Sequence, residues 1–309
     1  PFVFFQKLSV DKSILKGKLM RNTLKASTLE SKFPVLSVEH GAIISKDADM
    51  TLAYRVDLPE LYTVTNSDSE AIHSAWLKAI RVLPNFSIVH RQDWFIEENY
   101  QPEINGEDVS FLSRSFQLHF NERPFLNHTS YLFLTKTTKE RMRQQSNFNA
   151  LTRGFIIPKE MQDKETALRF LESTDQFEQI INDSGFIKIR RLATDEIVGT
   201  DNTAGIMEKY LSLSQEETTS LLDIDLYPSH MRIGDKQVVL HTLSDAEDLP
   251  SAVNTDIRYE KLSTDRSDCR FSFAAPVGVL LNCNHIYNQF IFIGDHSENL
   301  RQFEKQARN

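Results

Sequence analysis

Apolar residues follow two different spacings along this chain, and the spacing changes several times between its ends. Alternating apolar and polar positions, rich in Val, Ile, Tyr and Phe, are typical of strands with one buried face. This pattern predicts strands over 35–39, 50–58, 86–96 and 129–135. The first half of the chain is therefore expected to contribute strands to a sheet.

A helical spacing of apolar residues begins after residue 66. Ser67 and Glu70 have the spacing of a capping box, which predicts that a helix begins at Ser67. Pro84 ends the pattern, because proline cannot continue a helix. One face of this predicted helix carries Ala71, Ile72, Ala75, Trp76, Ala79 and Ile80.

Two further segments have the same spacing. Residues 110–120 place Leu112, Phe116 and Phe120 four residues apart, which predicts a second helix. Residues 163–184 predict a third helix, and Gly185 is a natural cap at its end. The apolar face of the third helix is predicted to contain Leu168, Leu171, Phe177, Ile180 and Ile181.

The remainder of the chain returns to strand signals. Gly234–Asp235 separates two short apolar runs and predicts a hairpin. Further strands are predicted over 186–189, 269–273 and 287–293, and a short helix begins at Ser297. Strand and helix signals alternate throughout, and no repeat of solenoid length is present.

These elements predict an α+β fold. We expect mixed or antiparallel sheets packed with helices, arranged as two α+β subdomains over 20–160 and 161–309. Residues 1–19 precede Met20 and are interpreted as an extension that is non-native or disordered.

Charge is unevenly distributed over the 309 residues, whose formal net charge is −8. Residues 1–32 carry seven Lys or Arg against two acidic residues, whereas 195–268 carries 16 acidic and 6 basic side chains. An acidic body disfavours broad binding to duplex DNA, which needs clustered cations. The basic first 32 residues suit contact with an anionic membrane or a phosphate backbone, or else form a solvated tail.

Cysteine content and hydropathy indicate the redox compartment and whether a membrane-spanning helix is expected. Two cysteines without a CxxC pair fit a reducing compartment better than a disulfide scaffold. No apolar run approaches the roughly 20 residues that a membrane-spanning helix needs.

Nucleotide-binding motifs are absent from the sequence. A P-loop requires GxxxxGK[ST], and among the ten glycines only Gly17 is followed by Lys, with Leu19 after it. Neither GxGxxG nor GxSxG occurs. We therefore expect no ATP hydrolysis by a P-loop mechanism, and we assign no catalytic, cofactor-binding or metal-binding residue.

Cys269, Cys283 and His285 form the best metal-ligand candidate, because thiolate and imidazole are ligands that zinc prefers. Structural zinc sites normally have four ligands at tighter spacing. The competing interpretation is two small buried hydrophobic residues and a hydrogen-bonded histidine at a strand edge.

Acidic residues and histidines offer weaker candidates. Glu122 with His119 or His128 could form a hydrolytic pair, but a hydrogen-bonded turn between helix and strand also explains them. The acid pairs Asp47/Asp49 and Asp223/Asp225 lack the ligand spacing of a calcium or glycosidase site, and solvated turns explain them better.

The main basic cluster of the body consists of Lys136, Lys139, Arg141 and Arg143, in the sequence KTTKERMR. These residues are the candidate contact for nucleic acid or for a partner. Single-stranded DNA binding would also need an aromatic residue for stacking, and Phe148 is the nearest. Arg190–Arg191 is the other basic pair. A solvated helix face or a docking surface for an acidic partner competes with DNA binding.

Several long stretches are distinctive, among them TLESKFPVLSVEHG, HSAWLKAIRVLPNFSIVHRQDWFIEENY and LSTDRSDCRFSFAAPVGVLLNCNHIYNQF. Together with the rest of 20–309, they resemble the amino-terminal region of the TraG family of conjugation ATPases. Those proteins energise type IV secretion machines that move conjugative transposons and plasmids between Bacteroides-type bacteria. The last stretch, residues 262–290, also predicts a packed strand pair with a polar turn.

This resemblance implies a non-catalytic assembly and docking domain. Such a domain couples the motor to inner-membrane transfer subunits and to self-association, at the cytoplasmic face of the inner membrane. ATP and Mg²⁺ are expected only in a motor domain that this sequence lacks. The alternative function is a single-stranded nucleic-acid-binding module of the same apparatus.

Overall fold

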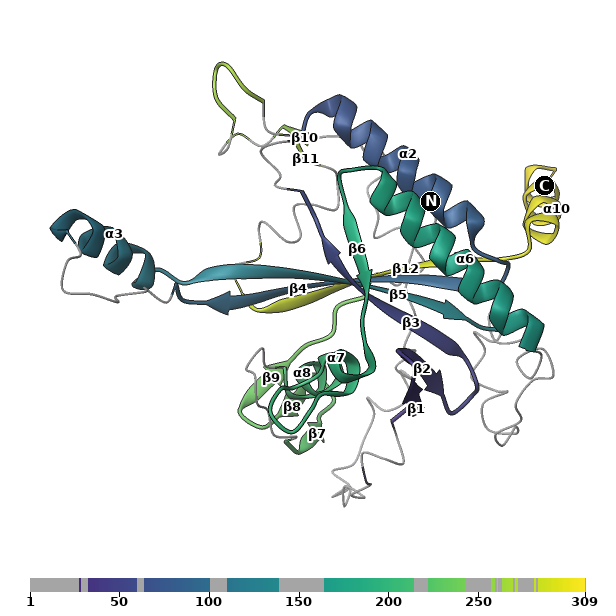
Figure 1. Ribbon diagram of the computed structural model, residues 1–309, viewed down its shortest axis with the longest axis horizontal. Coiled ribbons are helices and arrows are strands. Elements are labelled where there is room, and N and C mark those ends of the chain that lie inside the picture. Colours follow the sequence, from purple (N-terminus) through teal and green to yellow (C-terminus); the bar gives the residue numbers. More distant parts are fainter. Residues whose placement is uncertain are drawn as a thin grey trace, which may run out of the picture.

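Seven strands form one antiparallel sheet in the computed structural model of the chain (Figure 1). The structure describes residues 28, 33–59, 64–100, 110–138, 164–213, 222–242, 257–258, 260, 263–268, 270–271, 281 and 283–308. The strands of this sheet are β1 (Val35–Glu39), β2 (Ala42–Ser45), β3 (Met50–Asp57), β4 (Ser87–Glu98), β5 (Phe125–Lys136), β6 (Lys188–Arg191) and β12 (His285–Ile293).

Strand order shows that both halves of the chain build this sheet. The order is β1-β2-β3-β5-β4-β12, and β6 pairs with the second half of β3. The α+β prediction is confirmed, although every pairing among the described strands is antiparallel rather than mixed. β6 and β12 come from the predicted second subdomain, so the predicted boundary after residue 160 does not separate two sheets.

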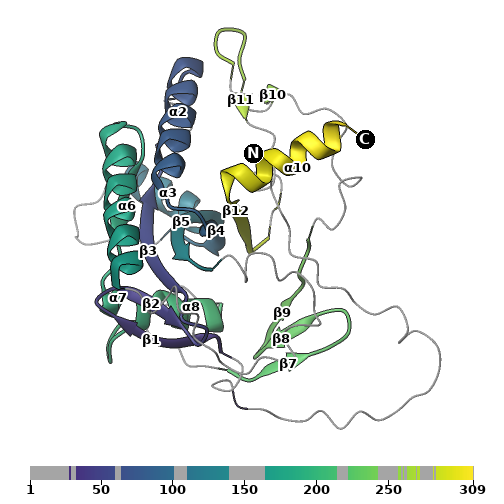
Figure 2. The same ribbon diagram turned by 90° about the vertical axis from the view of Figure 1, so that its right-hand side faces the viewer.

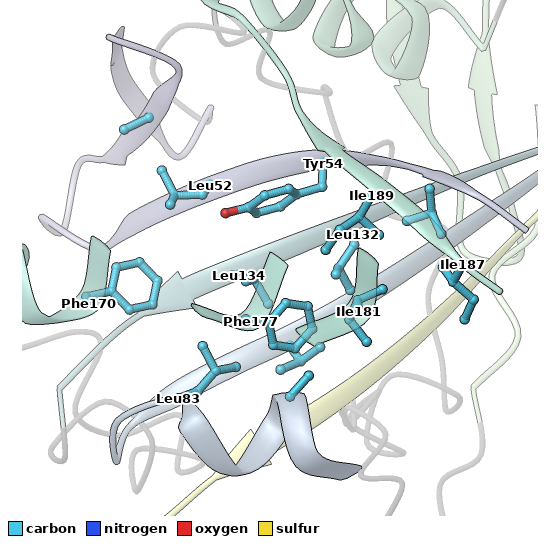
Figure 3. Close-up of a cluster of buried hydrophobic side chains, with 14 residues drawn as sticks. Leu52, Tyr54, Leu83, Leu132, Leu134, Phe170, Phe177, Ile181, Ile187 and Ile189 are labelled. Atoms are coloured by element: carbon cyan, nitrogen blue, oxygen red, sulfur yellow. The ribbon is translucent and has the colours of Figure 1, made fainter. Parts of the chain in front are cut away.

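Two long helices, α2 (Asn66–Val82) and α6 (Lys164–Asp183), lie side by side on one face of the sheet (Figure 2). The rings of Trp76 and Phe177 meet edge to face, with their centroids 5.7 Å apart. Figure 3 shows Phe170 and Phe177 of α6 in the same cluster as Leu132 and Leu134 of β5. Burial of this apolar face stabilises both helices on the sheet.

The start of α2 and the buried face of α6 differ from the sequence prediction. The N-cap of α2 is Thr65, whose hydroxyl accepts from the Asp68 backbone N–H while the Asp68 carboxylate accepts from the Thr65 N–H. This pair has the same spacing as Ser67 and Glu70 and lies two residues earlier, so it starts the helix first. In α6, Leu168 is exposed, and the fully buried positions are Phe170, Thr174, Phe177 and Ile181.

The opposite face of the sheet carries two short helices, α7 (Thr194–Val198) and α8 (Ile206–Ser212). Ile197 and Ile206 from these helices join a second buried cluster with Ala53, Trp94 and Tyr131 of the sheet. The connection between the helices is tight, because Gly205 packs directly against the backbone of residues 197–199.

Smaller elements complete the described part of the chain. The predicted hairpin at Gly234–Asp235 is confirmed between β8 (Met231–Ile233) and β9 (Lys236–Val238), and Gly234 adopts the positive φ that such a turn favours. β7 (Ile224–Leu226) pairs with β8, and β10 (Ile257–Arg258) pairs with β11 (Arg270–Phe271). The helix α10 (His296–Ala307) follows β12.

Within the described residues of 262–290, the two predicted strands do not pair with each other. β11 pairs with β10, and β12 pairs along its full length with β4. Local sequence cannot distinguish these partners, because an alternating apolar strand pairs equally well with any strand that offers a matching face.

β4 and β5 form the longest ribbon of the sheet, in continuous register from Ser87↔Lys136 to Glu98↔Phe125. The helix α3 (Phe111–Asn121) lies at the far end of this ribbon, away from the other helices (Figure 1). None of the helices that the structure describes is long and apolar enough to span a membrane.

Candidate functional site

Helix α3 presents a cluster of large apolar side chains to solvent. Phe111, Leu112 and Phe116 are 85%, 78% and 64% exposed, and α3 has no buried residue. Soluble proteins rarely leave so many large apolar side chains of one element exposed unless they bind something. We call this cluster the α3 surface, consisting of Phe111, Leu112, Phe116, Leu118, Phe120 and Phe125.

Local interactions stabilise α3 as a helix without a core beneath it. The Ser110 hydroxyl caps its first turn by accepting from the Ser113 backbone N–H at 3.2 Å. Phe116 and Phe120 lie four residues apart, and their ring centroids are 4.6 Å from each other. The predicted helix is therefore confirmed, although its apolar residues contribute to a surface rather than to the core.

The ribbon that carries α3 is braced by a charged cluster on its α2 side. Asp93 of β4 is almost completely buried and forms an ion pair with Arg91, whose Nε lies 2.8 Å from Asp93 Oδ2. It accepts from Arg91 Nη2 at 3.2 Å and from His128 Nε2 of β5 at 2.9 Å. Burial alone would raise the Asp93 pKa, but the hydrogen bond from His128 and the Arg91 charge outweigh it, and the pKa lies below its ordinary value. The His128–Asp93 bond joins β5 to β4 by side chains as well as by the backbone.

Aromatic stacking continues this bracing across the sheet. The Phe95 ring lies between His128 of β5 and His285 of β12, at centroid distances of 4.4 and 4.6 Å. On the other face, His90 stacks on Phe290 at 4.1 Å. Burial lowers the pKa of His90, although its hydrogen bond to Asn288 partly opposes this shift. The base of the ribbon is therefore a packed layer.

The metal candidate does not assemble within the described residues. His285 Nδ1 donates to the Cys283 backbone carbonyl at 2.8 Å, and its ring is stacked on Phe95. Cys283 is exposed, and Cys269 lies outside the described residues. In the part of the chain that the structure describes, no group of three or more His, Cys, Asp or Glu side chains could hold a metal ion.

The structure does not bring the hydrolytic candidates into contact with one another. His119 is exposed on α3 beside the Phe120 ring, and Glu122 is the C-cap of the same helix. His128 instead donates to Asp93. Asp47 and Asp49 lie in the turn between β2 and β3, where their backbone N–H groups donate to the Ser45 hydroxyl. Asp47 is exposed, as expected for a solvated turn, whereas Asp49 is partly buried.

Lys136 of the predicted basic cluster is a structural residue. It is buried, and its ammonium donates to the backbone carbonyls of Asn85 at 2.6 Å and Thr137 at 3.2 Å. A buried ammonium held in this way cannot also contact a nucleic acid or a partner surface. The other members, Lys139, Arg141 and Arg143, lie outside the described residues, as does Phe148.

The basic pair Arg190 and Arg191 also forms contacts within the protein. Arg190 forms a two-pronged ion pair with Glu196, with both N···O distances at 2.8 Å. Arg191 donates to the His40 backbone carbonyl at 3.1 Å. Glu196 therefore neutralises Arg190, whereas Arg191 ties β6 to the turn after β1.

Sequence reasoning missed the Asp93 cluster, although a signal for it exists. Arg91 and Asp93 are two residues apart in a predicted strand, so their side chains share one face. A buried carboxylate needs such a partner. The contribution of His128 depends on the register between β4 and β5, which the sequence does not state.

Comparison with protein families matches a part of the chain. Residues 22–74 match a protein-family model described as "Domain of unknown function, B. Theta Gene description (DUF3875)". The matched segment includes β1, β2, β3 and the first half of α2, and it excludes α3. No curated protein matches the chain.

Proposed function

We propose that this chain is a non-catalytic docking module of a conjugative-transfer ATPase of the TraG type. The exposed α3 surface, at the end of a braced ribbon, is the observation that carries the proposal. In this proposal α3 enters an apolar groove on another subunit of the transfer apparatus. Helices that bind in this way use apolar side chains at intervals of three and four residues, as Leu112, Phe116 and Phe120 do.

The charge of α3 favours a protein groove over a lipid surface. A helix that lies on an anionic membrane typically carries several Lys or Arg on its polar face. Over residues 110–125 the basic side chains are Arg114 and Arg123, and Glu122 offsets one of them. Lipid attraction would therefore be weak, whereas the large aromatic side chains suit a preformed pocket.

The wider context of the proposal rests on the sequence resemblance over 20–309. In this proposal the module lies at the cytoplasmic face of the inner membrane, in contact with inner-membrane transfer subunits and with other copies of the full-length protein. The partial family match, whose description refers to B. Theta, agrees with a Bacteroides-type source. ATP and Mg²⁺ would bind elsewhere in the full-length protein, because the sequence here contains no P-loop.

Co-purification of the chain with the inner-membrane subunits of a conjugation apparatus tests this proposal. We expect the double variant Leu112→Ser, Phe116→Ser to lose capture of its partner by about tenfold or more, because central apolar anchors dominate interface affinity. The matched control is Leu168→Ser on α6, which removes a comparably exposed apolar side chain from a different surface.

Two results would contradict the proposal. Equal capture by the wild type and the α3 double variant would remove α3 from the interface. Steady turnover of ATP by the purified chain would show that it is a catalytic protein rather than a docking module.

A further inference from the structure

A cavity of about 360 Å³ lies on the face of the sheet opposite α2 and α6. β3, β5 and β6 form its floor, and α7, α8 and the loop between them form its wall. Its volume is within the range of small-molecule sites. The side chains that decide its chemistry are Arg55, Tyr131, Arg190, Asp195, Glu196 and Lys209.

The floor of the cavity holds an arginine without a carboxylate partner. In the strand register, Arg55 of β3 lies opposite Tyr131 of β5 and opposite Arg190 of β6. Arg190 is neutralised by Glu196, and this ion pair lowers the Glu196 pKa to about 2. Arg55 donates only to the Tyr131 hydroxyl, at 3.1 Å, within the described part of the chain. Most of its five N–H donors therefore remain available to a ligand.

The wall of the cavity supplies a second cationic side chain that has no carboxylate partner among the described residues. Lys209 of α8 has no side-chain hydrogen bond or ion pair to any residue that the structure describes. The Tyr131 hydroxyl accepts from Arg55, so its own hydrogen can be donated towards the cavity. Asp195 and Glu196 offset two of the three cationic side chains, which leaves the lining with one excess positive charge.

The wall is built to keep its shape. α7 and α8 each carry a Glu in the first turn whose carboxylate accepts from the backbone N–H of the N-cap residue. Glu196 accepts from the Ala193 N–H, and Glu208 accepts from the Gly205 N–H. Thr200 and Thr203 exchange backbone hydrogen bonds in the loop between them. A preformed wall lets a ligand bind without the entropic cost of ordering a loop.

We propose that this cavity binds the phosphoryl group of a small molecule. A planar carboxylate can be satisfied by one arginine fork, whereas a tetrahedral phosphoryl group has oxygens for donors from several directions. Arg55 and Tyr131 offer donors from the floor, and Lys209 offers them from the wall. This site is separate from the α3 surface and does not depend on the proposed docking function.

Isothermal titration calorimetry of the full chain with inorganic phosphate tests whether the cavity binds a phosphoryl group. We expect saturable binding of phosphate, and we expect Lys209→Met and Arg55→Gln each to weaken it by about tenfold, because each removes a charge-assisted hydrogen bond. Lys209→Met is the safer variant for folding, since this side chain has no partner among the described residues to lose. Arg81→Gln on the exposed face of α2 is the control, and it should leave binding unchanged.

Three outcomes would overturn the proposal. No saturable binding at about 10 mM phosphate would leave the cavity without the proposed ligand. An equal effect of Arg81→Gln would mean that phosphate responds only to net charge. Succinate binding as tightly as phosphate would assign the site to carboxylates instead.

Discussion

Tyr54 lies in the core beneath α2 and α6, where its hydroxyl group is near Thr174 but makes no hydrogen bond of good geometry with a described residue, and the Thr174 hydroxyl donates to the Leu171 carbonyl instead. Burial raises its pKa to about 12, because the phenolate would have no solvent around it. A buried hydroxyl without a partner costs free energy that a phenylalanine would not. Tyr54 therefore packs as an aromatic residue, and its polar atom destabilises the native state.

This assignment predicts that Tyr54→Phe keeps or raises the free energy of unfolding, by up to about 1 kcal/mol. Tyr131→Phe is the matched control, because its hydroxyl is bonded to Arg55 and its loss should cost about 1 kcal/mol. Urea denaturation of both variants measures the difference. If Tyr54→Phe destabilises the chain as much as the control does, its hydroxyl has a partner in solution.

At the scale of single elements, α3 and α6 show how one pattern leads to two outcomes. Both helices carry apolar side chains at helical spacing. α6 buries Phe170 and Phe177 against the sheet, whereas α3 lies beyond the core and leaves Phe111 and Phe116 exposed. Full burial of Phe111 or Phe116 against a partner would contribute roughly 1.5–3 kcal/mol for each side chain. This free energy is the driving force available for binding.

The α7–α8 connection gives a prediction at the same scale. Gly205 has an ordinary φ, but an added Cβ would overlap the backbone of residues 197–199. We expect Gly205→Ala to lower the free energy of unfolding by more than about 2 kcal/mol, because neighbouring backbone cannot move aside cheaply.

Gly185→Ala is the control for this prediction. Gly185 has a φ of +77° with open space around it, so alanine there should cost only about 1 kcal/mol from backbone strain. Thermal unfolding of the two variants should rank Gly205→Ala as the more damaging. The reverse ranking would mean that the loop relaxes around the added methyl group.

For the whole molecule, the sheet joins segments that are far apart in sequence. β12 pairs with β4 across almost 200 residues, and β6 and α6 complete the core that β3, β4 and β5 begin. A chain of residues 1–160 would lack Phe170, Phe177 and Ile181, all of which are fully buried. It would therefore expose the face of the sheet that these side chains cover.

We expect the 1–160 fragment to unfold without a cooperative transition and to bind a dye that reports exposed apolar surface. The full chain, treated in the same way, should give one cooperative transition for this core. A cooperatively folded 1–160 fragment would instead support the predicted subdomain boundary after residue 160.

Much of the secondary structure follows from local sequence. The strands β1, β3, β4 and β5 and the helices α2, α3 and α6 were predictable to within a few residues, because side-chain spacing and caps act locally. The predicted cap Ser67 is wrong, because Thr65 and Asp68 have the same capping-box spacing and lie two residues earlier.

The sequence by itself determined the α+β class, most of the elements and the absence of a P-loop, since all of these depend on neighbouring residues. Only the tertiary structure decided that β12 pairs with β4, that Lys136 is buried, that α3 is exposed and that Arg55 and Lys209 share a cavity. These features depend on which strands pair and in which register. Many pairings bury similar apolar area, so only the packing of the whole chain selects one of them.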